Sequence, residues 1–284
     1  AAQWQGFSAE QKETILSEFR LTYLAESEVN WCPSLGTVLA NDEIVNGVSE
    51  RGGHPVVRKK MKQWSMRITA YAQRLLDGLE NIDWPEPLKE SQRHWIGRSQ
   101  GASVRFDIKG HPGQIEVFTT RPDTIFGVSF LTLAPEHELV AALTTAEQKI
   151  AVEEYVAASA QRSERERMAD VKTISGVFTG AYAIHPLSGA EVPIWIGDYV
   201  LAGYGTGAVM AVPCGDQRDF DFAKHFDLPI PHIFQDVSVD NDAYVLKDPC
   251  VLGHSDFLSG LHYSAACVPA IKPLEACGPG RWTI

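Results

Sequence analysis

Residues 205–223 read GTGAVMAVPCGDQRDFDFA. Glycines open this stretch, a short apolar run follows, and Pro213 comes shortly before two acids and an arginine. An apolar run without clear periodicity is typical of a strand covered on both faces, and the residues after it predict an amphipathic helix. The first turn of a helix offers unpaired backbone N–H groups and a partial positive charge. The stretch therefore predicts a strand-to-helix junction that brings polar groups to one place.

Length and composition indicate a globular protein large enough for two domains. The chain has 284 residues, 44% of them hydrophobic, and a formal net charge of -11. This charge argues against a nucleic-acid-coating protein or a membrane-surface binder, so an RNA partner would have to be engaged locally. No apolar run reaches the roughly 20 residues of a membrane helix, and residues 1–7 lack a signal-peptide pattern. We expect a soluble, cytoplasmic protein that does not bind membranes.

Familiar metal and nucleophile motifs are missing from the sequence. The five cysteines are widely spaced without a CxxC pair, and the nine histidines show neither HxH nor HExxH spacing. Neither a GxSxG elbow nor a Walker sequence occurs. We therefore expect no disulfide, no zinc site built from cysteines and no histidine acting as general base.

The first part of the chain predicts helices and short strands. Ser8 and Gln11 have the spacing of a capping box at the start of a helix. Short strands are predicted over residues 37–40, 44–47 and 56–57. Apolar side chains at offsets of four, three, four and four predict a helix over 61–80: Trp64, Ile68, Tyr71, Leu75 and Leu79. The basic run at 58–60, with Lys62 and Arg67, favours a solvated helix face over contact with a phosphate backbone.

The second part, from residue 98 on, predicts a β-rich domain. Alternating residues over 104–108 and 115–119, separated by a turn sequence, predict a hairpin. A stretch over 144–170 without glycine or proline predicts one long helix. Further strands are predicted over 194–196, 199–201 and 208–212, and a further helix over 219–226.

Residues 119–124 read TTRPDT, a dense group of polar side chains after an alternating strand. Pro122 restricts Arg121 to extended geometry. Hydroxyl groups can orient a water molecule, and a guanidinium can hold a phosphate or a carbonyl oxygen. The alternative is an ordinary strand end, in which Asp123 caps a turn and Arg121 pairs with a surface acid. Both interpretations stay open on the residues alone.

Asp216 and Asp219 have two interpretations of the same kind. Aspartate is favoured at the start of a helix, where its charge complements the helix dipole, and we expect one of the two to cap the helix. Arg218 between them and the glycine-rich run before them also favour a cleft, in which a carboxylate could pair with the ammonium group of a ligand.

Four stretches together resemble leucyl-tRNA synthetase: NWCPSLGTVLANDEIVNG at 30–47, TTRPDT at 119–124, GTGAVMAVP at 205–213 and DQRDFDFA at 216–223. The resemblance covers nearly the whole chain. The valine enzyme's pattern reads TTRPET and the isoleucine enzyme's TTTPWT, so Asp123 and the 30–47 stretch favour leucine. Neither adenylate-forming signature of class I synthetases, HIGH or KMSKS, occurs. We therefore expect the editing domain of a larger enzyme, with a flanking piece.

The resemblance implies an α/β fold with two parts. Residues 98–284 would form a β-barrel-like editing domain with peripheral helices, and residues 1–97 a small α+β flanking module, helical and zinc-ribbon-like. That module often carries zinc in the family through several cysteines. After Cys32 the matching positions hold Ser49 and Gly52, so we expect the zinc to be lost.

The activity implied by the resemblance is post-transfer editing, the hydrolysis of isoleucyl or norvalyl esters from the 3′ end of tRNA(Leu). Aminoacyl-tRNA synthetases are the known example of such a double sieve, because a hydrophobic pocket discriminates one methylene by only about 1–3 kcal/mol. An aminoacyl ester is already activated, so orienting the ester and a water suffices and no cofactor is expected. ATP and Mg would serve only the absent synthetic part. The remainder of the parent synthetase would hold most of the tRNA.

Site roles also follow from the resemblance. Asp219 would anchor the α-ammonium, Asp216 would assist in binding substrate and water, and Thr120 would help to place the attacking water. The other implied positions are Thr119 and Arg121 for the terminal adenosine and the ester, Thr124 as the wall that excludes leucine, and Tyr204, Met210 and Val212 as the lining of the pocket. The family usually has histidine before Asp216, where this chain has Gly215. That departure keeps open the alternative of a non-catalytic module that docks tRNA or the parent enzyme.

Overall fold

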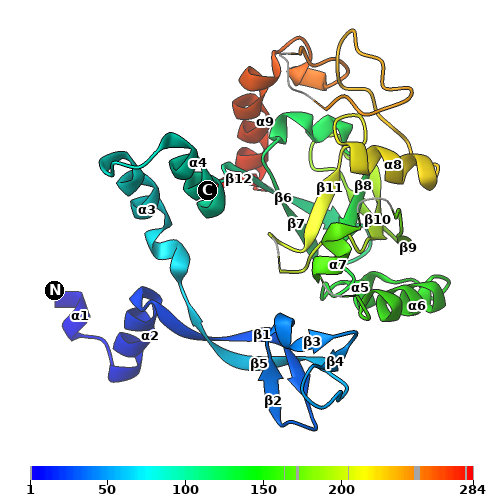
Figure 1. Cartoon of the computed structure of the whole chain (residues 1–284). Coiled ribbons are helices and arrows are strands. Elements are labelled where there is room, and N and C mark those ends of the chain that lie inside the picture. Colours follow the sequence, from blue (N-terminus) through cyan, green and yellow to red (C-terminus); the bar gives the residue numbers. More distant parts are fainter. Residues whose placement is uncertain are drawn as a thin grey trace. The chain divides into compact units, whose positions relative to one another are not determined.

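A computed structural model describes residues 2–162, 164–170, 173–203, 205–245, 250–278 and 280–283. The chain divides into two compact units, Ala1–Arg98 and Ser99–Ile284. Each unit contains both helices and strands (Figure 1). The expected mixed α/β class is therefore confirmed.

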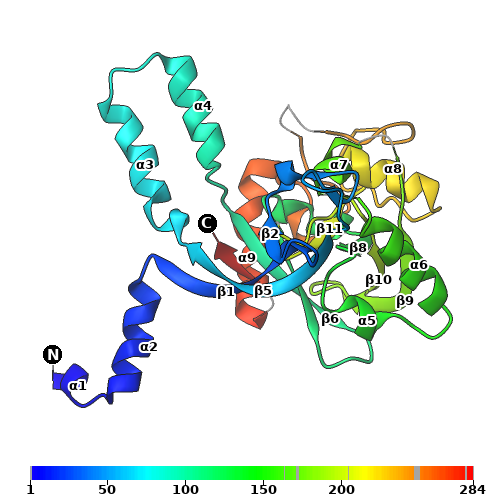
Figure 2. The same cartoon turned by 60° about the horizontal axis from the view of Figure 1, so that its bottom comes forward.

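The first unit is built on a long antiparallel ribbon of β1 (Thr22–Cys32) and β5 (Val57–Met66), which Figure 2 shows as a bent pair of strands. The shorter strands are β2 (Thr37–Leu39), which pairs with β1, and the β3 (Ile44–Val45) and β4 (Val48–Ser49) hairpin. The helices are α1 (Ala2–Gln5), α2 (Ala9–Phe19), α3 (Ala72–Gly78) and α4 (Glu86–Ile96), with 3-10 turns η1 (Asn41–Glu43), η2 (Ile68–Tyr71) and η3 (Leu79–Asn81). The predicted capping box at Ser8 and Gln11 is confirmed, with hydrogen bonds of 2.9 and 3.1 Å.

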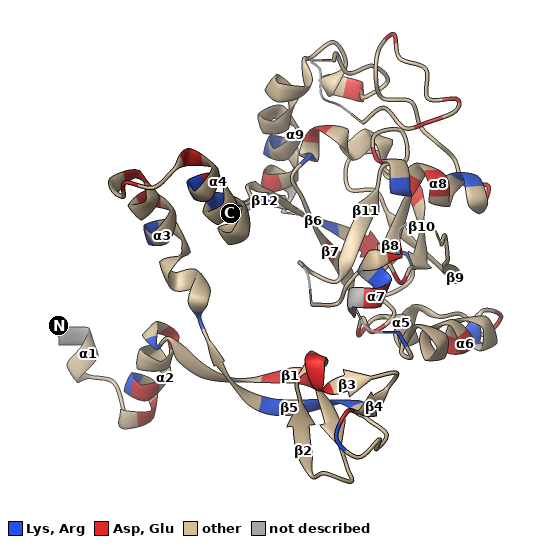
Figure 3. Ribbon diagram, viewed as in Figure 1, with Lys and Arg blue, Asp and Glu red and all other residues tan. Residues whose placement is uncertain are grey.

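The predicted helix over 61–80 is wrong in its first part. Residues 61–66 belong to β5, and only Ala72–Gly78 form an α-helix. The basic residues of β5 lie beside acidic residues of β1 (Figure 3), with Lys62 opposite Glu26 and Lys60 opposite Glu28. Cross-strand pairs of opposite charge stabilise a sheet, so this basic run is one side of a charge ladder instead of a helix face.

The second unit contains a seven-stranded sheet in the order β11-β8-β10-β9-β6-β12, and the seventh strand, β7, also pairs with β6. The strands are β6 (Gly101–Ile108), β7 (Gln114–Thr119), β8 (Phe130–Leu133), β9 (Val177–Ile184), β10 (Glu191–Ile196), β11 (Ala208–Ala211) and β12 (Gly280–Thr283). The β6/β7 pairing confirms the predicted hairpin. β11 comes close to β7, but no hydrogen-bonded pairing joins them within the described strands, so a closed barrel is not seen.

The helices of the second unit are α5 (Val140–Leu143), α6 (Lys149–Ser159), α7 (Glu164–Ala169), α8 (Gln217–His225) and α9 (Tyr263–Cys277), with 3-10 turns η4 (Pro122–Gly127) and η5 (Asp256–Leu258). The prediction of one helix over 144–170 is wrong, because α6 ends at Ser159. Beyond it Arg162 turns to the carboxylates of Asp198 and Asp170, at 2.7 and 2.8 Å. The predicted strand over 199–201 is also wrong, because the Val200 N–H closes a turn onto the Gly197 carbonyl.

Helix α8 is fixed to the sheet by aromatic packing. Phe222 of α8 stacks on Phe130 of β8 with ring centroids 5.0 Å apart, and both side chains are buried. Phe222 also contacts Trp195 and Phe226 edge-on or tilted. Aromatic pairs of this kind add stability beyond the area that they bury. This packing holds α8 against β8 and β10 of the sheet.

Candidate functional site

The start of α8 is capped by Asp216. Its Oδ1 accepts hydrogen bonds from the backbone N–H groups of Arg218 at 2.9 Å and Asp219 at 3.1 Å. This confirms that one of the two acids caps the helix. The Asp219 side chain therefore does not cap the helix.

Asp219 is buried one turn into α8, and its Oδ2 accepts a hydrogen bond from the Val212 backbone N–H at 2.8 Å. Burial raises the pKa of Asp219 to about 8, and the negative charge of Asp216 adds to this effect. The Val212 N–H and Arg218 act in the opposite direction. A buried carboxyl group in such surroundings gains most from a positive charge placed beside it.

The 119–124 segment forms the end of β7 and the first turn of η4. The Thr119 hydroxyl accepts from the Arg121 N–H at 3.0 Å, and the Thr124 hydroxyl donates to the Arg121 carbonyl at 2.8 Å. The Arg121 side chain pairs with Asp123, which is fully buried, instead of with a surface acid. Burial alone would lower the pKa of Arg121, but the hydrogen bond and charge of Asp123 outweigh it and the pKa is raised.

The side chain of His185 anchors turn η4. The His185 Nδ1 accepts from the backbone N–H groups of Leu187 and Ser188, so the ring proton lies on Nε2, which donates to the Ile125 carbonyl at 2.9 Å. Phe126 stacks on the imidazole at 5.8 Å. Burial lowers the pKa of His185, so the neutral form that these bonds require is favoured.

The structure brings the two polar segments together. A Cβ atom at Gly127, the last residue of η4, would lie 2.9 Å from a methyl group of Val212 and 3.3 Å from the Cys214 sulfur. Strands β7 and β11, which lead into the two segments, also lie side by side. The 119–124 segment and the junction at 208–219 therefore lie close together, although they are far apart in sequence.

The residues implied by the resemblance differ in exposure. Thr124, Val212 and Asp219 are buried, Thr119, Arg121 and Met210 are half-buried, and Thr120 and Asp216 are exposed. Tyr204 lies outside the described residues. The sequence interpretation missed the residues that hold this set in place: His185, Tyr199, Tyr263 and Cys267. The turn sequence HPLSG from His185 to Gly189 was a local signal for the first, whereas the others come from distant elements.

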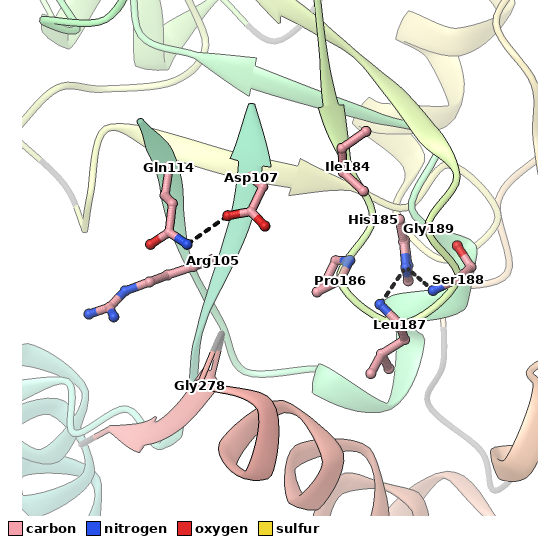
Figure 4. A pocket seen from close by; sticks show the side chains of 10 residues that line it. All are labelled: Arg105, Asp107, Gln114, Ile184, His185, Pro186, Leu187, Ser188, Gly189 and Gly278. Carbon is pink, nitrogen blue, oxygen red and sulfur yellow. Dashed lines mark hydrogen bonds between the residues drawn. The ribbon is translucent and has the colours of Figure 1, made fainter. Parts of the chain in front are cut away.

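Two pockets flank this region. The larger, of about 760 Å³, lies between β6, β7 and the 185–189 turn (Figure 4), and none of the implied site residues lines it. The smaller, of about 330 Å³, lies beside α8 and is lined by Asp216, Arg218 and Tyr199 among others. The Arg218 guanidinium lies over the Tyr199 ring at 5.2 Å. Asp216 therefore both caps α8 and lines the smaller pocket.

Neither a metal-binding cluster nor a membrane-spanning helix occurs within the described residues. No group of three or more His, Cys, Asp or Glu side chains is arranged there to hold a metal ion. In the flanking unit, the Ser49 hydroxyl accepts from the His54 N–H at 3.0 Å and donates to the Arg51 carbonyl at 2.9 Å. Hydrogen bonds of this serine thus hold the 49–54 turn. None of the described helices is long and apolar enough to cross a membrane.

The sequence of residues 93–275 matches the family described as leucyl-tRNA synthetase, editing domain. The chain belongs to this family. It is 68% identical over 280 residues to a leucine--tRNA ligase of Christiangramia forsetii and 65% identical over 286 residues to one of Flavobacterium johnsoniae. Each alignment covers 99% of this chain. The recognition of leucyl-tRNA synthetase from the four sequence stretches is confirmed.

A solved structure agrees with this family membership. The ternary complex of Agrobacterium radiobacter K84 agnB2 LeuRS with tRNA and LeuAMS matches with a TM-score of 0.67 and 35% identity, over 96% of this chain and 31% of that chain. The two relatives are covered over 29% and 30% of their own length. The chain thus spans about 30% of the length of the curated relatives that it matches.

Proposed function

We propose that this chain carries out post-transfer editing, the hydrolysis of non-cognate aminoacyl esters from the 3′ end of tRNA(Leu). Isoleucyl and norvalyl esters are the substrates that we expect. The observation that carries the proposal is the buried Asp219 carboxyl group, whose pKa is raised to about 8 in the free chain. An α-ammonium group beside it would supply the missing positive charge and stabilise the ionised carboxylate.

In the proposed reaction a water molecule attacks the ester carbonyl carbon. The bond between that carbon and the ribose oxygen breaks, and the ribose oxygen takes up a proton, so the products are the free amino acid and the tRNA. The exposed Thr120 hydroxyl would help to orient the water, and Asp216 would assist beside it. No covalent intermediate is required, because orientation of an activated ester and a water accounts for a large acceleration.

The amino-acid side chain would enter the region between η4 and the end of β11. Thr124 and Val212 are buried there and Met210 is half-buried, so the lining would be mainly apolar. The buried Thr124 would exclude leucine. Thr119 and Arg121, at the rim of this region, would hold the ester and the terminal adenosine.

The partners that we propose are the 3′ end of tRNA(Leu) and the remainder of a parent synthetase. A chain of net charge -11 repels a polyanion, so only the tRNA end would enter this site while basic surfaces elsewhere hold the rest. We expect the chain alone to bind tRNA weakly, and we propose a cytoplasmic location and no cofactor for the hydrolysis.

The test is the release of isoleucine from mischarged tRNA(Leu) by the chain as it stands. We expect a rate well above spontaneous hydrolysis, and a loss of at least 100-fold in Asp219→Ala. Equal rates for the chain and the variant would contradict the proposal. Binding of tRNA without any turnover would instead support the non-catalytic docking module that Gly215 keeps open.

A further inference from the structure

The guanidinium group of Arg121 is held on two sides. Its Nε donates to Asp123 Oδ1 at 2.9 Å and its Nη2 to Asp123 Oδ2 at 2.7 Å, a bidentate pair. The ring of Tyr263 lies against its face, 5.3 Å from the guanidinium carbon to the ring centroid. Bidentate pairing fixes the plane of a guanidinium, and stacking on an aromatic ring fixes its tilt.

Asp123, Tyr263 and Cys267 form a clamp around Arg121, and helix α9 supplies the last two of them. Tyr263 and Cys267 are four residues apart, so they project from one face of the helix. The Cys267 thiol donates to Asp123 Oδ1 at 3.6 Å. Burial and the charge of Asp123 raise the pKa of Cys267, so the thiol keeps the proton that it donates. Asp123 thus receives hydrogen bonds from Arg121, the residue before η4, and from Cys267 of α9.

This arrangement leaves part of the guanidinium for a ligand. An arginine side chain has five N–H groups, and the two hydrogen bonds to Asp123 use two of them. In the described part of the chain no other side chain accepts a hydrogen bond from Arg121. Asp123 is fully buried whereas Arg121 is about one-third exposed, so part of the arginine side chain is open to solvent while the carboxylate that holds it is not.

We propose that Asp123 and Tyr263 are positioning residues, which hold the Arg121 guanidinium in the orientation that receives the ester end of the substrate. The inference rests on the proposed function for its effect on turnover. It adds a role for Asp123, to which the sequence resemblance gave none, and a role for Tyr263 of α9.

The first experiment is a double-mutant cycle. Asp123→Asn keeps the shape of the side chain and removes the charge, and we expect kcat/KM for isoleucyl-tRNA(Leu) to fall at least tenfold. Because Asp123 acts through Arg121, adding Asp123→Asn to Arg121→Ala should change kcat/KM by less than twofold. Two losses that multiply in the double variant would overturn the inference.

Substitutions of Tyr263 test the stacking. Tyr263→Leu should lower kcat/KM by about three- to tenfold through weaker orientation of Arg121, and Tyr263→Phe, which keeps the ring, should recover most of that loss. The control is Glu116→Gln, which removes the Arg105–Glu116 pair of 2.9 Å on the β6/β7 hairpin outside the site. A loss in the control as large as in Asp123→Asn would contradict a specific role.

A measurement without substrate separates this inference from the proposed function. We expect the Arg121 Nε–H in the wild-type chain to exchange with solvent at least tenfold more slowly than that of the exposed Arg51, as followed by NMR. Asp123→Asn should abolish this protection while the backbone amide spectrum remains that of the folded chain. Fast exchange in the wild type would overturn the inference even if the chain is active. Protection that depends on Asp123 in an inactive chain would support the positioning while the proposed function fails.

Discussion

The backbone N–H of Val212 donates to the buried carboxylate of Asp219 at 2.8 Å. This bond joins the end of the strand to the first turn of α8, and it is the direct hydrogen bond to the carboxylate within the described residues. A single neutral donor does not compensate for burial next to Asp216, so the pKa of Asp219 rises to about 8. Burial and the charge of Asp216 therefore favour the protonated form of the Asp219 carboxyl group.

Asp219 should make the chain less stable as the pH rises. The pKa of Asp219 is raised in the folded state, so its contribution to the free energy of unfolding is complete below about pH 4 and is lost as the pH rises to about 8. Asp219→Asn removes this loss, which is on the order of a few kcal/mol. Urea unfolding of both proteins from pH 4 to pH 9 should show a flatter dependence in the variant, with higher stability at pH 8. Parallel curves would show that Asp219 is ionised in the free chain.

Gly215→His should increase the proposed deacylation by threefold or more. Gly215 has no left-handed backbone, and a Cβ there would lie 3.4 Å from the nearest atom, in the ring of Phe234, which is ordinary van der Waals contact. The backbone and the space at this position therefore accept a Cβ atom, which is the first requirement for the histidine that the resemblance implies here. Rates on mischarged tRNA(Leu) and the melting temperature would be measured together. A variant that is equally stable and no faster would show that histidine has no role here.

Thr124 allows the methyl and hydroxyl groups to be tested separately. Its hydroxyl is engaged by the Arg121 carbonyl, so the methyl group is the part left to exclude leucine. Thr124→Ser, which lacks the methyl, should begin to hydrolyse leucyl-tRNA(Leu), whereas Thr124→Val should still spare it. Losing the hydrogen bond should cost Thr124→Val about 1 kcal/mol in the free energy of unfolding. The reverse order of leucine hydrolysis would refute the methyl wall.

Gly101→Ala should disturb the site from the neighbouring strand. A Cβ at Gly101 would lie 2.1 Å from the Thr119 carbonyl oxygen, so the end of β7 must move. We expect a loss of about 1–3 kcal/mol in unfolding free energy and a lower deacylation rate. The matched control is Gly78→Ala in α3, where nothing lies within 4 Å. That change should stabilise the chain by about 0.4–1 kcal/mol. Equal effects of the two substitutions would contradict the close contact.

The strand-to-helix junction could be predicted from the sequence because its signals are local. Glycines, a short apolar run, a proline and a capping aspartate follow one another, and β11 and α8 begin within two residues of the predicted positions. The TTRPDT segment could be recognised as a cluster of polar side chains for the same reason.

Other parts depend on contacts between residues far apart in the chain. Residues 61–66 have helical apolar spacing with the residues after them, but they pair with β1, which local periodicity cannot indicate. Cys267 contacts Asp123 across 144 residues, so the clamp around Arg121 left no trace in either segment alone. The open sheet likewise depends on pairing between strands from both ends of the unit.

The most direct test of the account compares hydrolysis of isoleucyl-tRNA(Leu) and leucyl-tRNA(Leu) by this chain under the same conditions. If Asp219 anchors the ammonium and Thr124 excludes leucine, isoleucine should be released at least tenfold faster than leucine, and Asp219→Ala should lower the isoleucine rate to the spontaneous one. Release of both amino acids at the spontaneous rate, or at equal rates unaffected by Asp219→Ala, would contradict it.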